Sequence, residues 1–302
     1  MKKTIRHCLY VSLLMLLPLW TACDKDIHEN DRHGLAVGME WFDGIEPTDI
    51  TSPVNLWIYD AEGHEVEAHE FSSPQELASG LFSLPEGDYT LVGVCGLTEP
   101  YRYDYEGGVR TADMLRVSLA DPSASPAHAV GGVAGVRVTD TGVNLRSVIR
   151  VAPLLAELAV RIDGAPEGAS LAVTVRNAAT CLYPARRGDD NSYVVPSAEK
   201  TDALLPQAVA DRGTLSTDAR LMPTAQGEAC TMLYMVMTFA DGSRHEYTAE
   251  APLMLAGKRY ELALEYDRMQ PYMYITATDI NPWGEGWITS DDIFNPGIIS
   301  VQ

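Results

Sequence analysis

The chain has 302 residues, of which 46% are hydrophobic, and its formal net charge at pH 7 is −20. A surface this acidic repels phosphate groups, so nucleic acids are excluded as an expected partner. The length and the hydrophobic content favour one large or two ordinary domains with real cores.

The first 22 residues have the features of a secretion signal. An apolar run at residues 9–19 is shorter than the roughly 20 residues that a membrane-spanning helix needs. Positively charged residues precede the run: Lys2, Lys3 and Arg6. We therefore expect residues 1–22 to be removed and to take no part in the fold.

The signal ends in Leu19-Trp20-Thr21-Ala22-Cys23, which resembles the lipobox of bacterial lipoproteins, except that Trp20 stands where Leu is usual. Small residues before a cysteine suit a lipoprotein signal peptidase. We expect Cys23 to become the acylated first residue, carrying palmitate or a similar chain, and to anchor the protein without a transmembrane helix. The alternative is an ordinary secretory signal with an incidental cysteine.

The stretch after the lipobox is polar and cannot pack a core, so residues 23–34 are predicted to form a flexible, lipidated tether. Asp24 and Asp26 are either a sorting signal for delivery to the outer membrane and the cell surface or part of a solvated linker. Three cysteines follow, an odd number that argues against a disulfide framework: Cys95, Cys181 and Cys230. Cys95 lies in an apolar run typical of a core. Whether Cys181 pairs with Cys230 stays open.

Beyond the tether the hydrophobic pattern repeats every two residues, which indicates strands. In chain order we predict strands at 54–59, 66–71, 89–94, 133–138, 158–162, 171–175, 231–239, 244–249, 260–266 and 272–277. A single short helix is expected at residues 73–78, with Ser73 as its cap and Pro74 at its first position. Residues 183–226 are polar and rich in proline and glycine, so we expect a long loop with one strand at 193–195.

Three tyrosines alternate with charged residues before Gly107-Gly108: Tyr101, Tyr103 and Tyr105. Such a cluster is a candidate contact for a sugar or a partner side chain. The alternative, which we weigh more heavily, is a half-buried strand or loop, because aromatic alternation is common in strands.

Many strands with little helical periodicity predict an all-β fold of two tandem β-sandwich domains. The N-terminal domain is expected at residues 35–145 and the C-terminal domain at 146–290, with a boundary near Arg146. A tail follows at residues 291–302. Its segment Ile298-Ile299-Ser300-Val301 is β-prone, so Ile298 and Val301 are candidate contacts to another subunit; the alternative is a strand folded onto its own domain.

No motif for catalysis or metal binding is present: the sequence lacks HExxH, CxxC, GxSxG, a Walker-type glycine loop and an EF-hand loop. His64 and His69 are five residues apart, which places them on opposite faces of a strand. We expect no enzyme activity, no catalytic residues, no cofactor and no metal.

Two further stretches suggest a family. The first domain contains Leu84-Pro85-Glu86-Gly87-Asp88-Tyr89-Thr90-Leu91, and the last predicted strand continues into Ile280-Asn281-Pro282-Trp283-Gly284-Glu285-Gly286. With the lipobox, the tether and residues 151–162, they resemble the FimB-like, fimbrillin-type fimbrial anchor and accessory lipoproteins of anaerobic Gram-negative bacteria. The resemblance implies tandem transthyretin-like (Greek-key) sandwiches, no cofactor, and a role in a pilus.

The function expected from this resemblance is that of a lipid-anchored fimbrial subunit, an anchor or accessory component in pilus assembly and adhesion. Its partners would be the outer membrane, through acylated Cys23, and other fimbrial subunits. The alternative is a surface lipoprotein that captures a glycan or a host protein.

Overall fold

The computed structural model describes residues 34–41, 53–122, 125–139, 145–186, 194–274 and 280–281. Cys23, Ile298, Val301, the signal, the tether up to residue 33 and the tail lie outside the described residues. The chain from Gly34 onward groups into one compact unit, separate from residues 1–33, and the fold below is that of this unit.

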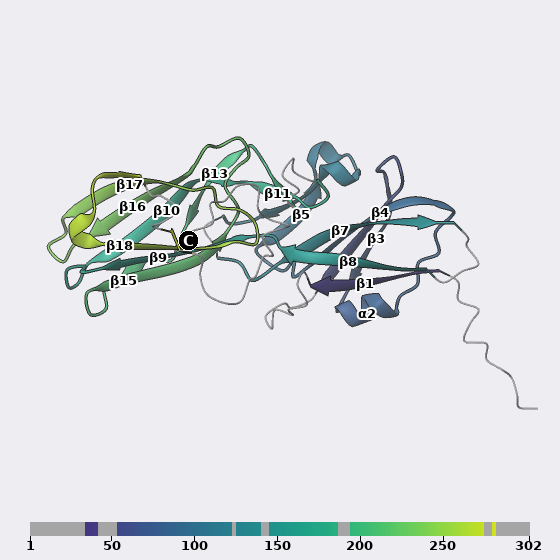
Figure 1. Ribbon diagram of the computed structural model, residues 1–302, viewed down its shortest axis with the longest axis horizontal. Helices are drawn as coiled ribbons and strands as arrows, with labels where there is room; N and C mark the ends of the chain where they lie inside the picture. The colour runs from purple at the N-terminus through teal and green to yellow at the C-terminus, as the bar shows by residue number, and fades with distance from the viewer. Residues whose placement is uncertain are drawn as a thin grey trace, which may run out of the picture. The chain divides into compact units, whose positions relative to one another are not determined.

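The first sheet has six strands (Figure 1). Their order across the sheet is β1 (Leu35–Trp41), β8 (Leu145–Pro153), β7 (Val130–Val138), β4 (Gly87–Cys95), β2 (Val54–Tyr59) and β3 (Glu65–Phe71). β1 runs parallel to β8, whereas the other neighbours are antiparallel. Apolar side chains from this sheet form a small core together with Leu77 and Phe82.

The predicted short helix is confirmed as α2 (Pro74–Ser79). The Ser73 hydroxyl accepts a hydrogen bond from the Glu76 backbone N–H at 3.1 Å, which satisfies one free donor of the first turn. Pro74 takes the first helical position, where its missing N–H costs nothing. Leu77 is fully buried and fastens the helix to the small core.

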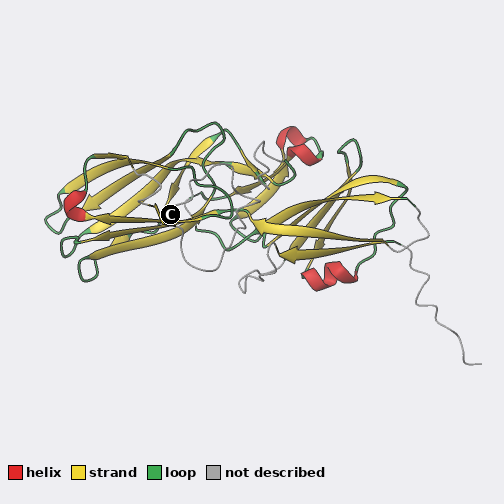
Figure 2. Cartoon of the chain, viewed as in Figure 1, coloured by secondary structure: helices red, strands yellow, loops and turns green. Residues whose placement is uncertain are grey.

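A sandwich of two sheets follows (Figure 2). One sheet has the order β13 (Lys200–Leu204), β10 (Ser170–Ala179), β16 (Thr231–Thr238), β17 (Arg244–Ala251) and β19 (Tyr272–Tyr274), and β14 (Ala208–Val209) also pairs with β10. The other has the order β15 (Thr214–Leu221), β9 (Ala156–Asp163), β18 (Arg259–Glu265) and β20 (Ile280–Asn281). Burial alternates along β9, β10, β15 and β16, as the period of two predicts.

A fourth sheet joins strands that are far apart in the sequence. Its order is β12 (Val195–Pro196), β11 (Cys181–Tyr183), β6 (Leu115–Leu119) and β5 (Tyr101–Tyr105). Leu182 of β11 lies opposite Val117 of β6. We call this the bridging sheet, because it joins residues that the sequence assigns to different domains. Short 3-10 turns complete the structure: η3 (Glu106–Gly108), η4 (Ala112–Met114) and η5 (Tyr266–Arg268).

The all-β class is therefore confirmed, while the tandem division and the Greek-key order stay predictions. The expected boundary near Arg146 falls inside β8, which pairs with β1 from Leu145 to Val151. We propose to place the division after Pro153, so that the first sheet stays whole. The expected long loop at 183–226 is wrong, because β12 to β15 lie in it. β12, β13 and β14 have two to five residues each, too few to show a period. β15 alternates in burial over eight residues, but its buried positions include Thr217 and Ala219, which weaken the apolar pattern.

Candidate functional site

The three predicted tyrosines lie on β5 but do not form one exposed cluster. Tyr101 is buried and donates a hydrogen bond to the Ala127 carbonyl at 2.7 Å. The Tyr105 hydroxyl donates to Glu65 and lies 3.1 Å from the Tyr59 hydroxyl. Burial raises the pKa of both Tyr101 and Tyr105, and for Tyr105 the neighbouring Glu65 carboxylate adds to the rise in pKa. These two hydroxyls are structural.

Tyr103 differs from its neighbours, since its side chain is 45% exposed. Its ring meets Trp57 edge-on, with 5.1 Å between the ring centroids and 76° between the ring planes. Trp57 itself is buried and orients the exposed ring. Contact of these tyrosines with a ligand stays a prediction, and Tyr103 is the one whose ring faces solvent.

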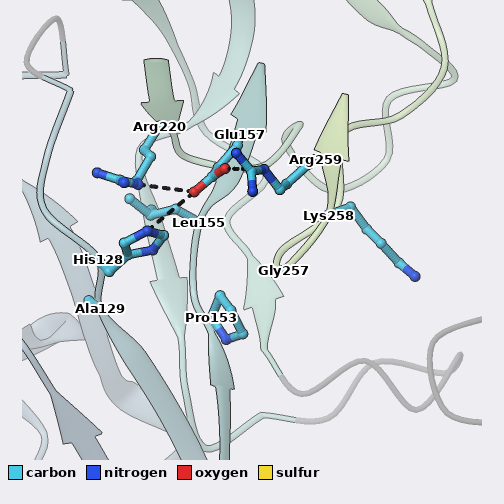
Figure 3. A pocket seen from close by; sticks show the side chains of 9 residues that line it. All are labelled: His128, Ala129, Pro153, Leu155, Glu157, Arg220, Gly257, Lys258 and Arg259. Carbon is cyan, nitrogen blue, oxygen red and sulfur yellow. Dashed lines mark hydrogen bonds and ion pairs between the residues drawn. The ribbon is translucent and has the colours of Figure 1, made fainter. Parts of the chain in front are cut away.

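A second polar site is centred on Glu157 of β9 (Figure 3). In the strand register Glu157 lies directly opposite Arg220 of β15 on one side and Arg259 of β18 on the other. Arg220 Nε donates to Glu157 Oε1 at 3.0 Å, and Arg259 Nε lies 2.6 Å from Oε2. His128 Nε2 lies 3.5 Å from Oε1.

These groups line a small pocket with room for about one water molecule. The Glu157 and His128 side chains are only 13% and 11% exposed, so the Glu157 carboxylate interacts with its neighbours in a medium less polar than water. Cross-strand pairs of opposite charge stabilise a sheet, and two arginines on one carboxylate use both of its oxygens. We therefore assign the Glu157 site a structural role. Its pocket is too small for a sugar ring.

The cysteines and histidines support no catalytic or metal centre among the described residues. Cys95, Cys181 and Cys230 are free thiols there, so the Cys181–Cys230 pair is not formed. Burial raises the pKa of Cys95 to about 12, which makes its thiolate scarce. No group of three or more potential ligands that could hold a metal occurs within the described part of the chain. His69 contacts Glu67 at 2.8 Å, while His64 lies near Asp60.

Sequence reasoning missed the Glu157 site. Glu157, Arg220 and Arg259 occupy ordinary outward positions on their strands, His128 lies in the segment before β7, and Glu157 and Arg220 are 63 residues apart. Only the register of three strands brings them together. The one available sequence signal is a charged residue at an end of each of these strands, which is too common to single out. Separately, no helix in the described ranges is long and apolar enough to cross a membrane.

The four sheets and the Glu157 site define the class of this protein: an all-β protein in which polar side chains pair between neighbouring strands. The family of fimbrillin-A associated anchor proteins Mfa1 and Mfa2 matches residues 42–289. The chain therefore belongs to this family, as the sequence resemblance predicts. Membership makes it a fimbrial accessory protein of the cell envelope, in a family whose role is structural and whose members associate with other fimbrial subunits.

Solved structures agree with this fold. The fimbrial anchor protein Mfa2 from Porphyromonas gingivalis is 12% identical, with a TM-score of 0.51, and the match covers 76% of this chain and 90% of that one. A candidate adhesin from Bacteroides thetaiotaomicron is 12% identical, with a TM-score of 0.55, over 78% and 92% of the two chains. A protein from the same species, described as a candidate polysaccharide-binding protein, is 13% identical, with a TM-score of 0.56, over 84% and 99%. No curated protein sequence matches the chain.

Proposed function

We propose that the protein is a lipid-anchored fimbrial subunit of the outer membrane, facing the cell surface, which serves as an anchor or accessory component of a pilus. The observation that carries this proposal is the family match over residues 42–289. The lipobox ending at Cys23 and the polar tether of residues 23–34 precede the matched region. Acyl chains on Cys23 would supply the membrane attachment, since two chains suffice for stable anchoring.

The direct test replaces the acylated residue. Cys23→Ala should abolish labelling with a fatty-acid analogue and move the protein from the membrane fraction to the soluble fraction, because the thiol that carries the lipid is gone. Cys8→Ala is the matched control, since it removes a thiol within the signal and leaves the lipobox intact. Unchanged labelling and unchanged membrane retention of Cys23→Ala would refute the lipid anchor.

A second function, capture of a glycan or a host protein at the surface, is favoured by one observation. Tyr103 presents an exposed ring that is fixed by buried Trp57, and such amphipathic rings are frequent at binding surfaces. One structural relative is described as a candidate polysaccharide-binding protein. This function is compatible with anchoring and would make the same surface protein adhesive.

A further inference from the structure

The connection between the first sheet and β9 is short and buried. β8 ends at Pro153 and β9 begins at Ala156, so Leu154 and Leu155 alone connect them, and their exposed fractions are 1% and 4%. The Leu154 N–H donates to the Ala129 carbonyl at 2.9 Å, and the Leu155 carbonyl accepts from the Gly257 N–H at 2.9 Å. A connection held on both sides cannot act as a flexible linker.

The Glu157 site lies beside this connection. His128 belongs to the segment that leads into β7 of the first sheet, whereas Arg220 and Arg259 belong to the sheet around β9 (Figure 3). One carboxylate thus contacts two side chains of the β9 sheet and one side chain from the segment that precedes β7. Its backbone is held as well, because the Glu157 N–H donates to the Lys258 carbonyl at 2.9 Å.

Arg220 holds the same segment by two further bonds. Its backbone N–H donates to the Ser125 hydroxyl at 3.0 Å, and its Nη1 donates to the Pro126 carbonyl at 3.3 Å. From the other direction, the Tyr101 hydroxyl donates to the Ala127 carbonyl at 2.7 Å. Residues 125–129 are therefore held between β5 and β15.

We infer that Glu157, Arg220, Arg259 and His128 form a polar lock that makes the first sheet and the β9 sheet open and unfold as one body. The bridging sheet pairs other strands and contains none of these four residues, so its pairing does not depend on them. The lock concerns cooperativity within the chain and does not depend on the fimbrial role. Without the lock, residues 125–129 and the Leu154–Leu155 connection should open more often, while both hydrophobic cores remain formed.

Hydrogen exchange followed by mass spectrometry on the full chain tests the lock. Glu157→Gln removes the charge and leaves two arginines facing a neutral amide, so peptides containing Leu154 and Arg220 should exchange about tenfold faster or more. Peptides from the core strands β10 and β16 should keep their wild-type rates. Glu261→Gln is the matched control, because this half-buried carboxylate lies on β18 opposite Ala159; it should change neither set of rates.

Two results would overturn the inference. One is exchange in Glu157→Gln that matches the control, or that rises equally in all strands. The other is calorimetry of the wild-type protein that shows two independent unfolding transitions. If Glu157→Gln yields no folded protein, His128→Gln decides instead, since it removes the imidazole that lies 3.5 Å from Glu157 Oε1 and leaves both arginine contacts in place. Unchanged exchange at Leu154 in this variant would also count against the lock.

Discussion

At the scale of single residues, Gly132 on β7 occupies a position with no room for a side chain. A Cβ atom at this position would lie 2.0 Å from the carbonyl oxygen of Arg150 on β8. A backbone oxygen cannot move aside as a flexible side chain can, so only glycine fits. The sequence predicts a strand at residues 133–138, which begins just after Gly132. The observed β7 begins at Val130, so Gly132 lies within it, where it allows β8 to approach closely.

Gly132→Ala is therefore predicted to lower the free energy of unfolding by about 1–3 kcal/mol or more, as overpacked cores do. Gly135→Ala on the same strand is the control, because nothing lies within 4 Å of its Cβ position. The control should change the free energy by no more than about 0.5 kcal/mol. Urea unfolding of both variants measures the difference, and equal stability of the two would contradict the close approach of β7 and β8.

At the scale of elements, longer strands with a clear apolar alternation could be predicted and very short strands could not. The alternation at 54–59 and 158–162 predicts β2 and β9, although β2 is buried on both faces, and the hairpin at Asp241-Gly242 joins β16 to β17. The strands between residues 195 and 209 have two to five residues each, too few to show a period. The bridging sheet and the Glu157 site depend on pairings between distant strands, which local patterns do not encode.

The edges of the sheets bear on the expected contact with other subunits. β3 is an edge strand that carries Glu65, Glu67 and Glu70, and charges of this kind discourage unwanted strand pairing. The β-prone tail segment from Ile298 to Val301 has no such charge. It is thus the better candidate for joining another subunit by strand addition.

Truncation after Asn295 distinguishes a donated tail from a folded one. If the tail pairs with a neighbouring subunit, the truncated protein should keep its melting temperature and lose its attachment to fimbriae. Each main-chain bond contributes only about 0.5–1.5 kcal/mol net, so several bonds must be lost together for this effect. A clear fall in melting temperature would instead assign Ile298 and Val301 to the core of their own domain.

At the scale of the whole molecule, early and late parts of the chain share one core. The larger core is shared by residues from Trp57 to Met269, and the bridging sheet links early and late strands. In the role proposed above, the chain would carry load between a lipid anchor and a fimbrial partner, which needs this continuity because a weak connection would yield first.

Isolation of fimbriae from cells, followed by immunoblotting for this protein, tests the central claim most directly. Cells that make the wild-type protein should keep their fimbriae attached, and the purified fimbriae should contain the protein. Cells that make Cys23→Ala should shed fimbriae into the medium together with the protein, since the lipid no longer holds them. Fimbriae that contain none of this protein, and that stay equally attached in both strains, would contradict the account.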